Sequence, residues 1–269
     1  MLIGDPVSHS LSPTMHNAAL AAAGSPLRYE AVQVDPHDLA ATMETFRAAH
    51  VAGNVTSPHK KNVLASMQKL TRVATRVGAV NTFWVDADGD LAGDNTDVTG
   101  FSGMVEEVLG GAPAGARVAV LGAGGAASAV LAALEVWEGA TATVHARDLS
   151  RASALQMRFS VVVRACSMRD LCLADATVVV NATPVGAGGT NEELPVDLDR
   201  ISPEAAVLDL AYARNETALV RLARGRGHVA SDGLPMLLHQ GVAAFHRWLG
   251  LDPDVDVMRN ALLHASGRT

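Results

Sequence analysis

The strongest chemical signal in this chain of 269 residues is a glycine-rich turn. The apolar run 118–121 predicts a buried strand that leads into Gly122-Ala-Gly-Gly-Ala-Ala127, after which a helix is predicted to start. Glycines at this spacing permit a tight turn and let a pyrophosphate approach the N–H groups at the helix N-terminus. Because the motif lies in the strand–loop–helix context that it requires, we predict a dinucleotide site there. Its binding residues would be Gly122, Ala123, Gly124, Gly125 and Ala126.

The segment from His145 to Arg151 follows the next predicted strand, where such domains distinguish NAD from NADP. An acidic residue there binds the ribose hydroxyls of NAD, whereas arginines pair with the 2′-phosphate of NADP. This chain has both kinds of residue. Arg147 and Arg151 are spaced to clasp one phosphate, and Asp148 between them is suited to cap the following helix. The sequence therefore favours NADP, with NAD as the alternative.

Three polar clusters in the first hundred residues fall at the ends of predicted elements. Ser10 and Ser12 offer two hydroxyls beside a helix N-terminus, a combination that could hold a carboxylate or cap the helix. Thr56 ends a predicted strand, and Lys60 lies in the first turn of the next predicted helix. A lysine there opposes the helix dipole, so its position indicates function rather than stability. Asp97 starts the helix after a predicted hairpin, where it could be a cap or a functional group.

These clusters need a scaffold in which strands and helices alternate. In the first hundred residues we expect helices over 12–24, 35–49 and from Pro58, strands over 30–34 and 51–56, and a hairpin of 79–85 with 90–93. Further on we expect strands over 117–121, 140–145, 161–164, 177–181, 206–210 and 228–230, and helices over 125–137, 149–157, 235–249 and 254–265. Near-continuous apolar strands that alternate with helices indicate a parallel sheet covered on both faces.

The predicted fold class is therefore α/β with two domains. Residues 1–99 would form an N-terminal α/β domain with a mixed sheet, and residues 100–234 a Rossmann-like, doubly wound domain with a parallel sheet. Residues 235–269 contain two final helices and no strand, and we expect them to return to the first domain.

Composition excludes several classes of protein. The 21 Lys and Arg against 28 Asp and Glu leave a net charge of −7, which disfavours a nucleic-acid partner. The uncharged run 118–134 contains glycines and is too short to span a membrane, and no secretory signal peptide is expected. Cys166 and Cys172 form no disulfide framework, and the ten histidines show no zinc-type spacing. We therefore expect a cytoplasmic protein without a bound metal.

The motifs together carry a family resemblance. The first domain contains Gly4-x-Pro6-x-x-His9-Ser10-x-Ser12-Pro13-x-x-His16-Asn17, Asn54-Val-Thr56-x-Pro58-His59-Lys60, Gly78-Ala-Val-Asn81-Thr82 and Asp94-Asn-Thr-Asp97-x-x-Gly100-Phe101. The glycine-rich turn is followed by Asn181-Ala-Thr183-Pro184-x-Gly186, Asp209-x-x-Tyr212 and Asp232-Gly233-x-x-Met236-Leu-x-x-Gln240. In this order, from residue 4 to about 250, the chain resembles the shikimate dehydrogenase family.

The resemblance implies a reaction and a set of site residues. The reaction would be the reversible reduction of 3-dehydroshikimate to shikimate by NADPH, in the chorismate pathway of aromatic amino-acid biosynthesis. Lys60 and Asp97 match the catalytic pair of the family, and the resemblance leaves open which of them is the formal acid. Substrate would be bound by Ser10, Ser12, Thr56, Asn81, Tyr212 and Gln240. Cofactor contacts would extend to Thr183, Leu210 and Gly233.

Two departures from the family pattern concern the sites. The usual cofactor turn, Asn-Arg-Thr, is Ala146-Arg147-Asp148 here, so two side chains that can bind phosphate are lost and a negative charge is gained. This change relaxes the preference for NADP toward NAD. In the motif that contains Asn54, family members usually have a glycine two residues before the asparagine. Here that position is Ala52, with Gly53 beside it, which is an exchange of small residues.

Four other interpretations are consistent with parts of the sequence. A quinate or quinate/shikimate dehydrogenase that uses NAD would share every motif. A non-catalytic ligand-sensing module could use the same scaffold, although Lys60 and Asp97 argue against it. A folate-type methylene dehydrogenase would not need Ser10 and Ser12, and a zinc enzyme lacks paired histidines. The small-molecule enzyme that we expect would be a monomer or a homodimer.

Overall fold

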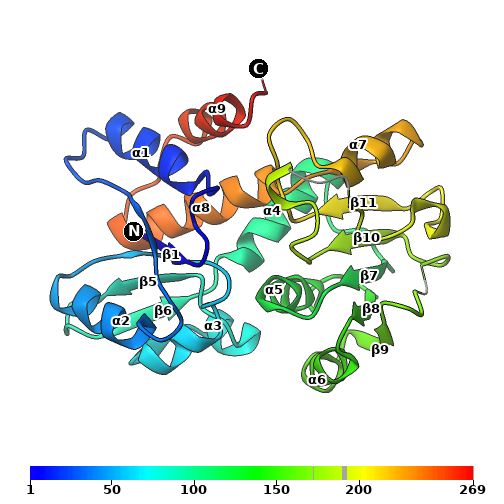
Figure 1. The fold of residues 1–269 in the computed structure, drawn as a ribbon, viewed down its shortest axis with the longest axis horizontal. Coiled ribbons are helices and arrows are strands. Elements are labelled where there is room, and N and C mark those ends of the chain that lie inside the picture. The colour runs from blue at the N-terminus through cyan, green and yellow to red at the C-terminus, as the bar shows by residue number, and fades with distance from the viewer. Residues whose placement is uncertain (172, 190–192, 269) are drawn as a thin grey trace. The chain divides into compact units, whose positions relative to one another are not determined.

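The computed structural model describes residues 1–171, 173–189 and 193–268, so Cys172 lies outside the described residues. The chain forms two compact units (Figure 1): a first unit of residues 1–100 and 237–269, and a second unit of residues 101–236. Helix α4 (Asp97–Leu109) starts in the first unit and continues into the second. Helix α8 (Leu234–Leu249) starts in the second unit and continues into the first.

The first unit is built on a mixed sheet with the strand order β2-β1-β3-β5-β6-β4. Strands β1 (Leu2–Gly4), β2 (Ala31–Gln33) and β3 (Gly53–Val55) are parallel. Strand β5 (Thr82–Val85) runs antiparallel to β3 and to β6 (Leu91–Asp94), its hairpin partner, and β4 (Lys69–Leu70) is parallel to β6. The expected mixed sheet is confirmed. Its register fixes where the loops after β3 and β6 emerge, and both loops carry predicted site residues.

Helices cover both faces of this sheet. They are α1 (Ser12–Ala22), α2 (Leu39–Ala48), α3 (Arg72–Val77), α8 and α9 (Val255–Ala265). Helix α3 and strand β4 were absent from the expected elements, because each is too short for a hydrophobic period to show. The Thr71 hydroxyl caps α3 by accepting from the Ala74 N–H at 3.1 Å, and Gly78 ends it at φ 66°.

The expectation of a helix from Pro58 is wrong. Residues 58–61 form a turn, and only the 3₁₀ helix η1 (Asn62–Ser66) follows. His59 within the turn is fully buried, and its Nε2 lies 2.7 Å from the carbonyl oxygen of Val34. This contact with a distant segment holds the backbone in a turn, so Lys60 projects from a turn rather than from a helix.

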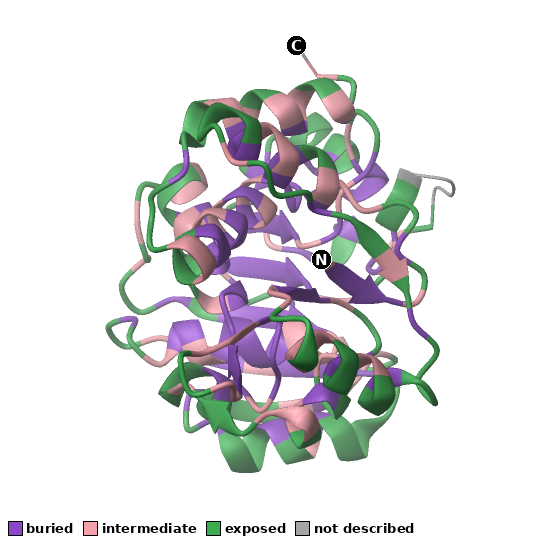
Figure 2. Ribbon diagram, turned by 90° about the vertical axis from the view of Figure 1, so that its left-hand side faces the viewer, coloured by how far each residue is buried: buried purple, intermediate pink, exposed green. Residues whose placement is uncertain are grey.

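Two apolar cores lie on the two faces of the first sheet. Figure 2 shows buried strands among more exposed helices; β1, β3 and β6 are buried, whereas the edge strands β2 and β4 are largely exposed. One core joins β1 to α1, α8 and α9, and it contains Leu237, Val242, Phe245 and Leu249. These four residues recur at roughly helical spacing in the sequence, as expected of a helix face that packs into a core. The other core lies beneath α2 and includes the stacked rings of Phe46 and Phe83.

The second unit is a doubly wound sheet with the order β12-β11-β10-β7-β8-β9, and every described pair is parallel. Its strands are β7 (Arg117–Leu121), β8 (Thr141–Ala146), β9 (Val162–Ser167), β10 (Val178–Asn181), β11 (Ala206–Asp209) and β12 (Ala230–Ser231). Its helices include α5 (Gly125–Leu134), α6 (Leu149–Arg158) and α7 (Ala218–Gly225). The strand order reverses between β7 and β10, where ligands of such sheets bind at the carboxyl ends. The Rossmann-like prediction is confirmed.

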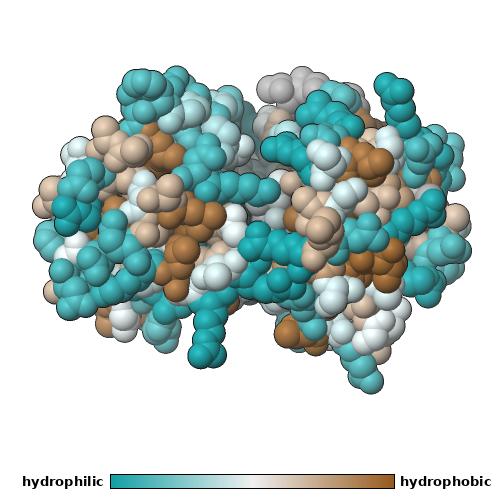
Figure 3. All heavy atoms as spheres, turned by 90° about the horizontal axis from the view of Figure 1, so that it is seen from below, coloured by the Kyte–Doolittle hydropathy of each residue, from teal (hydrophilic) through white to brown (hydrophobic). Residues whose placement is uncertain are grey.

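The surface carries no broad apolar face in the view of Figure 3, where hydrophilic side chains are interspersed with smaller hydrophobic patches. Among the helices of the described residues, none is long and apolar enough to cross a membrane.

Candidate active site

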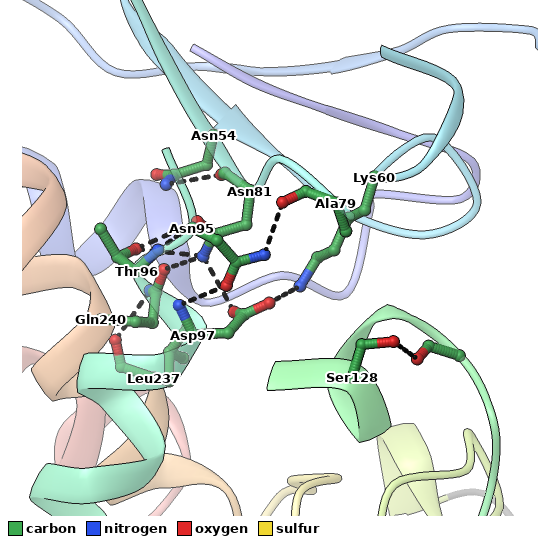
Figure 4. Close-up of polar contacts among 11 residues, drawn as sticks. Asn54, Lys60, Ala79, Asn81, Asn95, Thr96, Asp97, Ser128, Leu237 and Gln240 are labelled. Atoms are coloured by element: carbon green, nitrogen blue, oxygen red, sulfur yellow. Dashed lines mark hydrogen bonds and ion pairs between the residues drawn. The ribbon is translucent and has the colours of Figure 1, made fainter. Parts of the chain in front are cut away.

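The centre of the polar cluster in the first unit is an ion pair between Lys60 and Asp97 (Figure 4). Lys60 Nζ lies 2.6 Å from Asp97 Oδ2, and the two side chains are 21% and 6% exposed. Lys60 belongs to the turn after β3, and Asp97 is the first residue of α4, which follows β6. Strands β3 and β6 flank β5 in one sheet, and the segments that follow them bring together the two residues that the family resemblance pairs.

Asn81 holds the Asp97 carboxylate from the other side. Its Nδ2 donates to Asp97 Oδ1 at 2.9 Å, and its Oδ1 accepts from the backbone N–H of Thr96 at 2.7 Å. Because Oδ1 faces an N–H donor, the amide group can only present its NH₂ to the carboxylate. The same Nδ2 lies 3.4 Å from Oε1 of Gln240 on α8 (Figure 4). Four predicted site residues therefore form one hydrogen-bonded cluster.

Three residues that were not predicted as site residues support this cluster. Asn95 Oδ1 accepts from the Asp97 N–H at 3.2 Å, and its Nδ2 donates to the carbonyl of Ala79 at 2.9 Å. Asn54 Nδ2 donates to the carbonyl of Asn81 at 3.1 Å, and its Oδ1 accepts from the Tyr29 hydroxyl at 2.6 Å. Asn54 and Asn95 belong to the family motifs, and the motifs were the only sequence feature that could have identified them. No sequence feature pointed to Tyr29.

The two serines lie together at the start of α1. The backbone N–H of Ser12 donates to Ser10 Oγ at 3.2 Å, and Ser12 is buried. The expected cap by the Ser12 hydroxyl is wrong: the N-cap position is Leu11, and no side chain caps the helix. Apart from the Ser12 N–H, which donates to Ser10 Oγ, the first turn of α1 has no N–H capped by a side chain, and this suits an anionic ligand.

Thr56 follows β3 and packs against the loop after β1. A Cβ built on Gly4 would lie 2.3 Å from Thr56 Cγ2, so only glycine fits there beside the threonine. Similarly, a Cβ on Gly53 would lie 2.1 Å from the carbonyl oxygen of Met1, which explains why the glycine stands at 53 when position 52 is alanine. Tyr212 belongs to the second unit, where its carbonyl accepts from the Gly188 N–H at 3.1 Å.

The glycine-rich turn of the second unit connects β7 to α5 at the point where the strand order reverses. Gly122 has φ 110°, and a Cβ there would lie 2.8 Å from the carbonyl oxygen of Ala182. Gly124 is the N-cap of α5, which has no side-chain cap and no acidic residue in its first turn. Uncapped N–H groups in a left-handed, side-chain-free turn fit a pyrophosphate. The residues present therefore fit the predicted dinucleotide.

The turn after β8 bears the residues predicted to choose the cofactor. Asp148 caps α6: its Oδ1 accepts from the Ser150 N–H at 3.0 Å and from the Ser150 hydroxyl at 2.6 Å. The hydrogen bond from the Ser150 side chain is the main cause that lowers the pKa of Asp148. Arg147 and Arg151 are exposed on either side of it. The predicted capping role of Asp148 is confirmed, and its negative charge stays in the turn.

The other predicted cofactor residues lie at the carboxyl ends of β10, β11 and β12. Thr183 donates from its hydroxyl to Asn181 Oδ1 at 2.6 Å. Gly233 and Leu210 are in direct backbone contact, since a Cβ on Gly233 would lie 2.3 Å from the Leu210 carbonyl oxygen. These positions belong to the same sheet edge as the glycine-rich turn.

In the part of the chain that the structure describes, the group of possible metal ligands is an acidic trio on the β5–β6 hairpin. It consists of Asp86, Asp88 and Asp90. The Lys69 ammonium lies 2.6 Å from Asp86, 2.6 Å from Asp88 and 3.2 Å from Asp90. A cation of the protein itself thus contacts all three carboxylates and offsets one of their three negative charges.

Comparison with known proteins gives consistent matches along the chain. Residues 2–83 match the family described as "Shikimate dehydrogenase substrate binding domain", and residues 233–263 match "Shikimate 5'-dehydrogenase C-terminal domain". The "Shikimate dehydrogenase (NADP(+))" of Methylocella silvestris is 41% identical over 270 residues, which cover 98% of this chain and 95% of that protein.

Two solved structures are also similar. Shikimate 5-dehydrogenase from Thermus thermophilus, in complex with NADP(H) and shikimate, has a TM-score of 0.87 at 36% identity and covers 98% of each chain. Quinate dehydrogenase from Corynebacterium glutamicum, in complex with NAD, has a TM-score of 0.87 at 34% identity and covers 98% of this chain and 97% of its own.

Proposed function

The chain belongs to the shikimate dehydrogenase family, and from this premise we propose that it catalyses the reversible, NADPH-dependent reduction of 3-dehydroshikimate to shikimate. It is an NADP-dependent oxidoreductase that acts on a CH–OH group, in aromatic amino-acid biosynthesis. The observation that carries the proposal is the Lys60–Asp97 pair, held at 2.6 Å and oriented by Asn81. A ligand-sensing module would not need a proton donor in this geometry.

We assign the proton transfer to this pair. When bound, NADPH supplies the hydride that reduces the ketone carbon. The carbonyl oxygen then takes up negative charge, which the Lys60 ammonium stabilises while a proton passes to that oxygen. Asp97 pairs with Lys60 and aims its ammonium group. Solvent returns the proton to the pair, because Lys60 is partly exposed.

The remaining predicted residues divide by unit. In the first unit, Ser10, Ser12 and the uncapped start of α1 would bind the substrate carboxylate, with Thr56, Asn81 and Gln240 on the carboxylate or ring hydroxyls. Tyr212, which belongs to the second unit, would be a further substrate-binding residue. The cofactor would be held in the second unit by Gly122, Ala123, Gly124, Gly125, Ala126, Arg147, Arg151, Thr183, Leu210 and Gly233.

We also propose the domain roles and the setting of the enzyme. Residues 1–99 form the substrate-binding catalytic domain, 100–234 the dinucleotide-binding domain, and 235–269 the helices that complete the first. Two observations support these domain roles: each unit has its own sheet, and the polar cluster around Lys60 and Asp97 lies in the first unit. The enzyme works in the cytoplasm as a monomer or homodimer on a small molecule, and its net charge of −7 argues against a nucleic-acid partner.

The main rival is a quinate or quinate/shikimate dehydrogenase that uses NAD. Two observations support this second candidate function. One is the structural similarity to the quinate dehydrogenase, and the other is the negative charge of Asp148 in the cofactor turn. Steady-state oxidation of shikimate and of quinate, each with NADP⁺ and NAD⁺, separates the two functions. We expect the highest kcat/KM for shikimate with NADP⁺. A preference for quinate with NAD⁺ would establish the rival.

A further inference from the structure

A buried carboxylate in the second unit has no part in the proposed reaction. Asp209 is the last residue of β11, and its side chain is fully buried. Burial raises the pKa of Asp209 to about 6, so the protein bears a free-energy cost to keep an ionised group there. A buried ionisable residue with this cost requires an explanation from its contacts.

The contacts of Asp209 lead to one amide side chain. Asp209 Oδ1 accepts from Asn181 Nδ2 at 2.8 Å and from the Ala211 N–H at 3.1 Å. Asn181 is fully buried at the end of β10, the strand that pairs with β11. Its Nδ2 also donates to the carbonyl of Val185 at 3.1 Å. The NH₂ group of Asn181 is thereby directed at two acceptors.

The opposite side of the same amide organises the next turn of the chain. Asn181 Oδ1 accepts from the Thr183 N–H at 3.0 Å and from the Thr183 hydroxyl at 2.6 Å. An ionised Asp209 is an acceptor only, so it permits one of the two flips of the Asn181 amide. In that flip Oδ1 points at Thr183. The carboxylate and the Val185 carbonyl therefore both direct the NH₂ group away from Thr183, so Asp209 contributes to how Thr183 is held without contacting it.

This turn forms one side of the glycine-rich loop. A Cβ built on Gly122 would lie 2.8 Å from the carbonyl oxygen of Ala182 and 3.3 Å from Thr183 Cγ2. A movement of the 182–185 turn by a few tenths of an ångström would thus change the space available at the loop that fits the pyrophosphate.

We propose that Asp209 is a positioning residue for cofactor binding, which acts through Asn181 to hold the Thr183 turn against the glycine-rich loop. The proposal rests on the proposed function, because it assumes that this loop binds NADP. Asp209 does not touch the cofactor. Its removal should therefore weaken cofactor affinity while leaving the substrate residues of the first unit unchanged.

The test removes the acceptor. Asp209→Leu takes the carboxylate away from the Asn181 NH₂ group, whereas Asp209→Asn keeps an oxygen that can accept from Asn181 Nδ2 and from the Ala211 N–H. Asn181→Ala removes the amide that links Asp209 to Thr183. Isothermal titration with NADP⁺ and thermal unfolding are measured for each protein. Thr177→Val is the control, because it removes the bond from the Arg117 N–H to Thr177 Oγ1, 3.0 Å long, at the opposite end of β10.

We expect Asp209→Leu to raise the Kd for NADP⁺ about tenfold and Asp209→Asn to stay within about twofold of the wild type. The KM for shikimate should change less than about twofold, and Thr177→Val should lower the Tm with its Kd unchanged. A folded Asp209→Leu with the Kd of the wild type overturns the inference. If that variant does not fold, a folded Asn181→Ala that binds as the wild type overturns it, and one that binds about ten times more weakly supports it. Wild-type protein that binds neither NADP⁺ nor NAD⁺ refutes the proposed function instead.

Discussion

At the scale of single residues, the chemistry depends on a charged pair that lies where two loops of one sheet meet. Lys60 is partly exposed, whereas Asp97 is almost fully buried and accepts from both Lys60 and Asn81. A buried carboxylate that accepts from two donors is fixed in direction. Lys60 then keeps one position toward the substrate, which an exposed lysine on its own would not.

Removing the ammonium should abolish most of the turnover. Lys60→Met keeps the length of the side chain and loses the proton donor, so we expect kcat to fall about 10²- to 10⁴-fold with little change in the KM for NADP⁺. Steady-state oxidation of shikimate measures both constants. Lys61→Met, which changes the exposed neighbouring lysine, is the matched control and should keep wild-type turnover. Undiminished kcat in Lys60→Met would contradict the catalytic assignment.

The charge of Asp148 should weaken the preference for NADP⁺ over NAD⁺. Asp148→Thr retains an oxygen that can cap α6 and removes one negative charge from the turn that holds Arg147. We expect the ratio of kcat/KM for NADP⁺ to that for NAD⁺ to rise about fivefold. Asp197→Thr is the control, since Asp197 is an exposed aspartate that caps η3 (Leu198–Arg200) in the same unit. An unchanged or lower ratio in Asp148→Thr would show that this charge does not act on the cofactor.

At the scale of elements, helix α8 positions Gln240 through anchors two turns further along. Arg247 Nη2 lies 2.7 Å from Asp94 Oδ2, and Trp248 Nε1 donates to Thr82 Oγ1 at 2.9 Å. Residues seven apart face the same side of a helix, so Gln240 and Arg247 both face the β5–β6 region of the sheet. The anchors fix the rotation of α8, and the rotation places Gln240 beside Asn81.

Arg247→Met should loosen this helix. Asp94 is buried and would lose its cationic partner, so we expect the free energy of unfolding to fall by about 2 kcal/mol. The KM for shikimate should rise severalfold because Gln240 is no longer held. Urea unfolding and steady-state kinetics measure the two effects. The double variant Arg247→Met, Asp94→Asn should lose less unfolding free energy than the two single variants lose in sum. If the two losses add strictly, the Arg247–Asp94 pair does not anchor the helix.

At the scale of the whole molecule, buried ionisable groups make stability depend on pH. His16 is fully buried in an aromatic cluster, with its ring centroid 4.5 Å from that of Tyr29 and 5.0 Å from that of Trp248. Burial lowers the pKa of His16 from 6.5 to about 3. Because the folded state holds the neutral ring, the stability contributed is complete above pH 6.5 and is lost as the pH falls toward 3.

His16→Phe should remove this part of the pH dependence. Between pH 7.5 and pH 5 the wild type should lose about 2 kcal/mol of unfolding free energy through His16, and the variant should lack that loss. Phenylalanine retains an aromatic ring in the cluster. Urea unfolding at the two pH values gives the comparison, with His37→Gln on the surface as a control that keeps the wild-type slope. Equal slopes in His16→Phe and the wild type would contradict the argument.

Much of the fold could be predicted because its causes are local. Alternating strands and helices, the glycine-rich turn after β7 and the capping role of Asp148 all follow from residues close in sequence, and the structure confirms them. The predictions that failed were also local ones: a distant contact of His59 replaced the expected helix at Pro58, and Leu11 rather than Ser12 is the N-cap of α1.

The sequence by itself determined the chemical types available and the backbone that each loop could adopt, since glycine at 122 permits φ 110° and a close approach to Ala182. Only the tertiary structure decided which groups meet. Asn81 bonds to Asp97 and lies beside Gln240, which is 159 residues away along the chain. Hydrogen bonds of this kind depend on the register of β3, β5 and β6 and on the rotation of α8. No local pattern encodes them, because they arise from packing between elements that are distant in sequence.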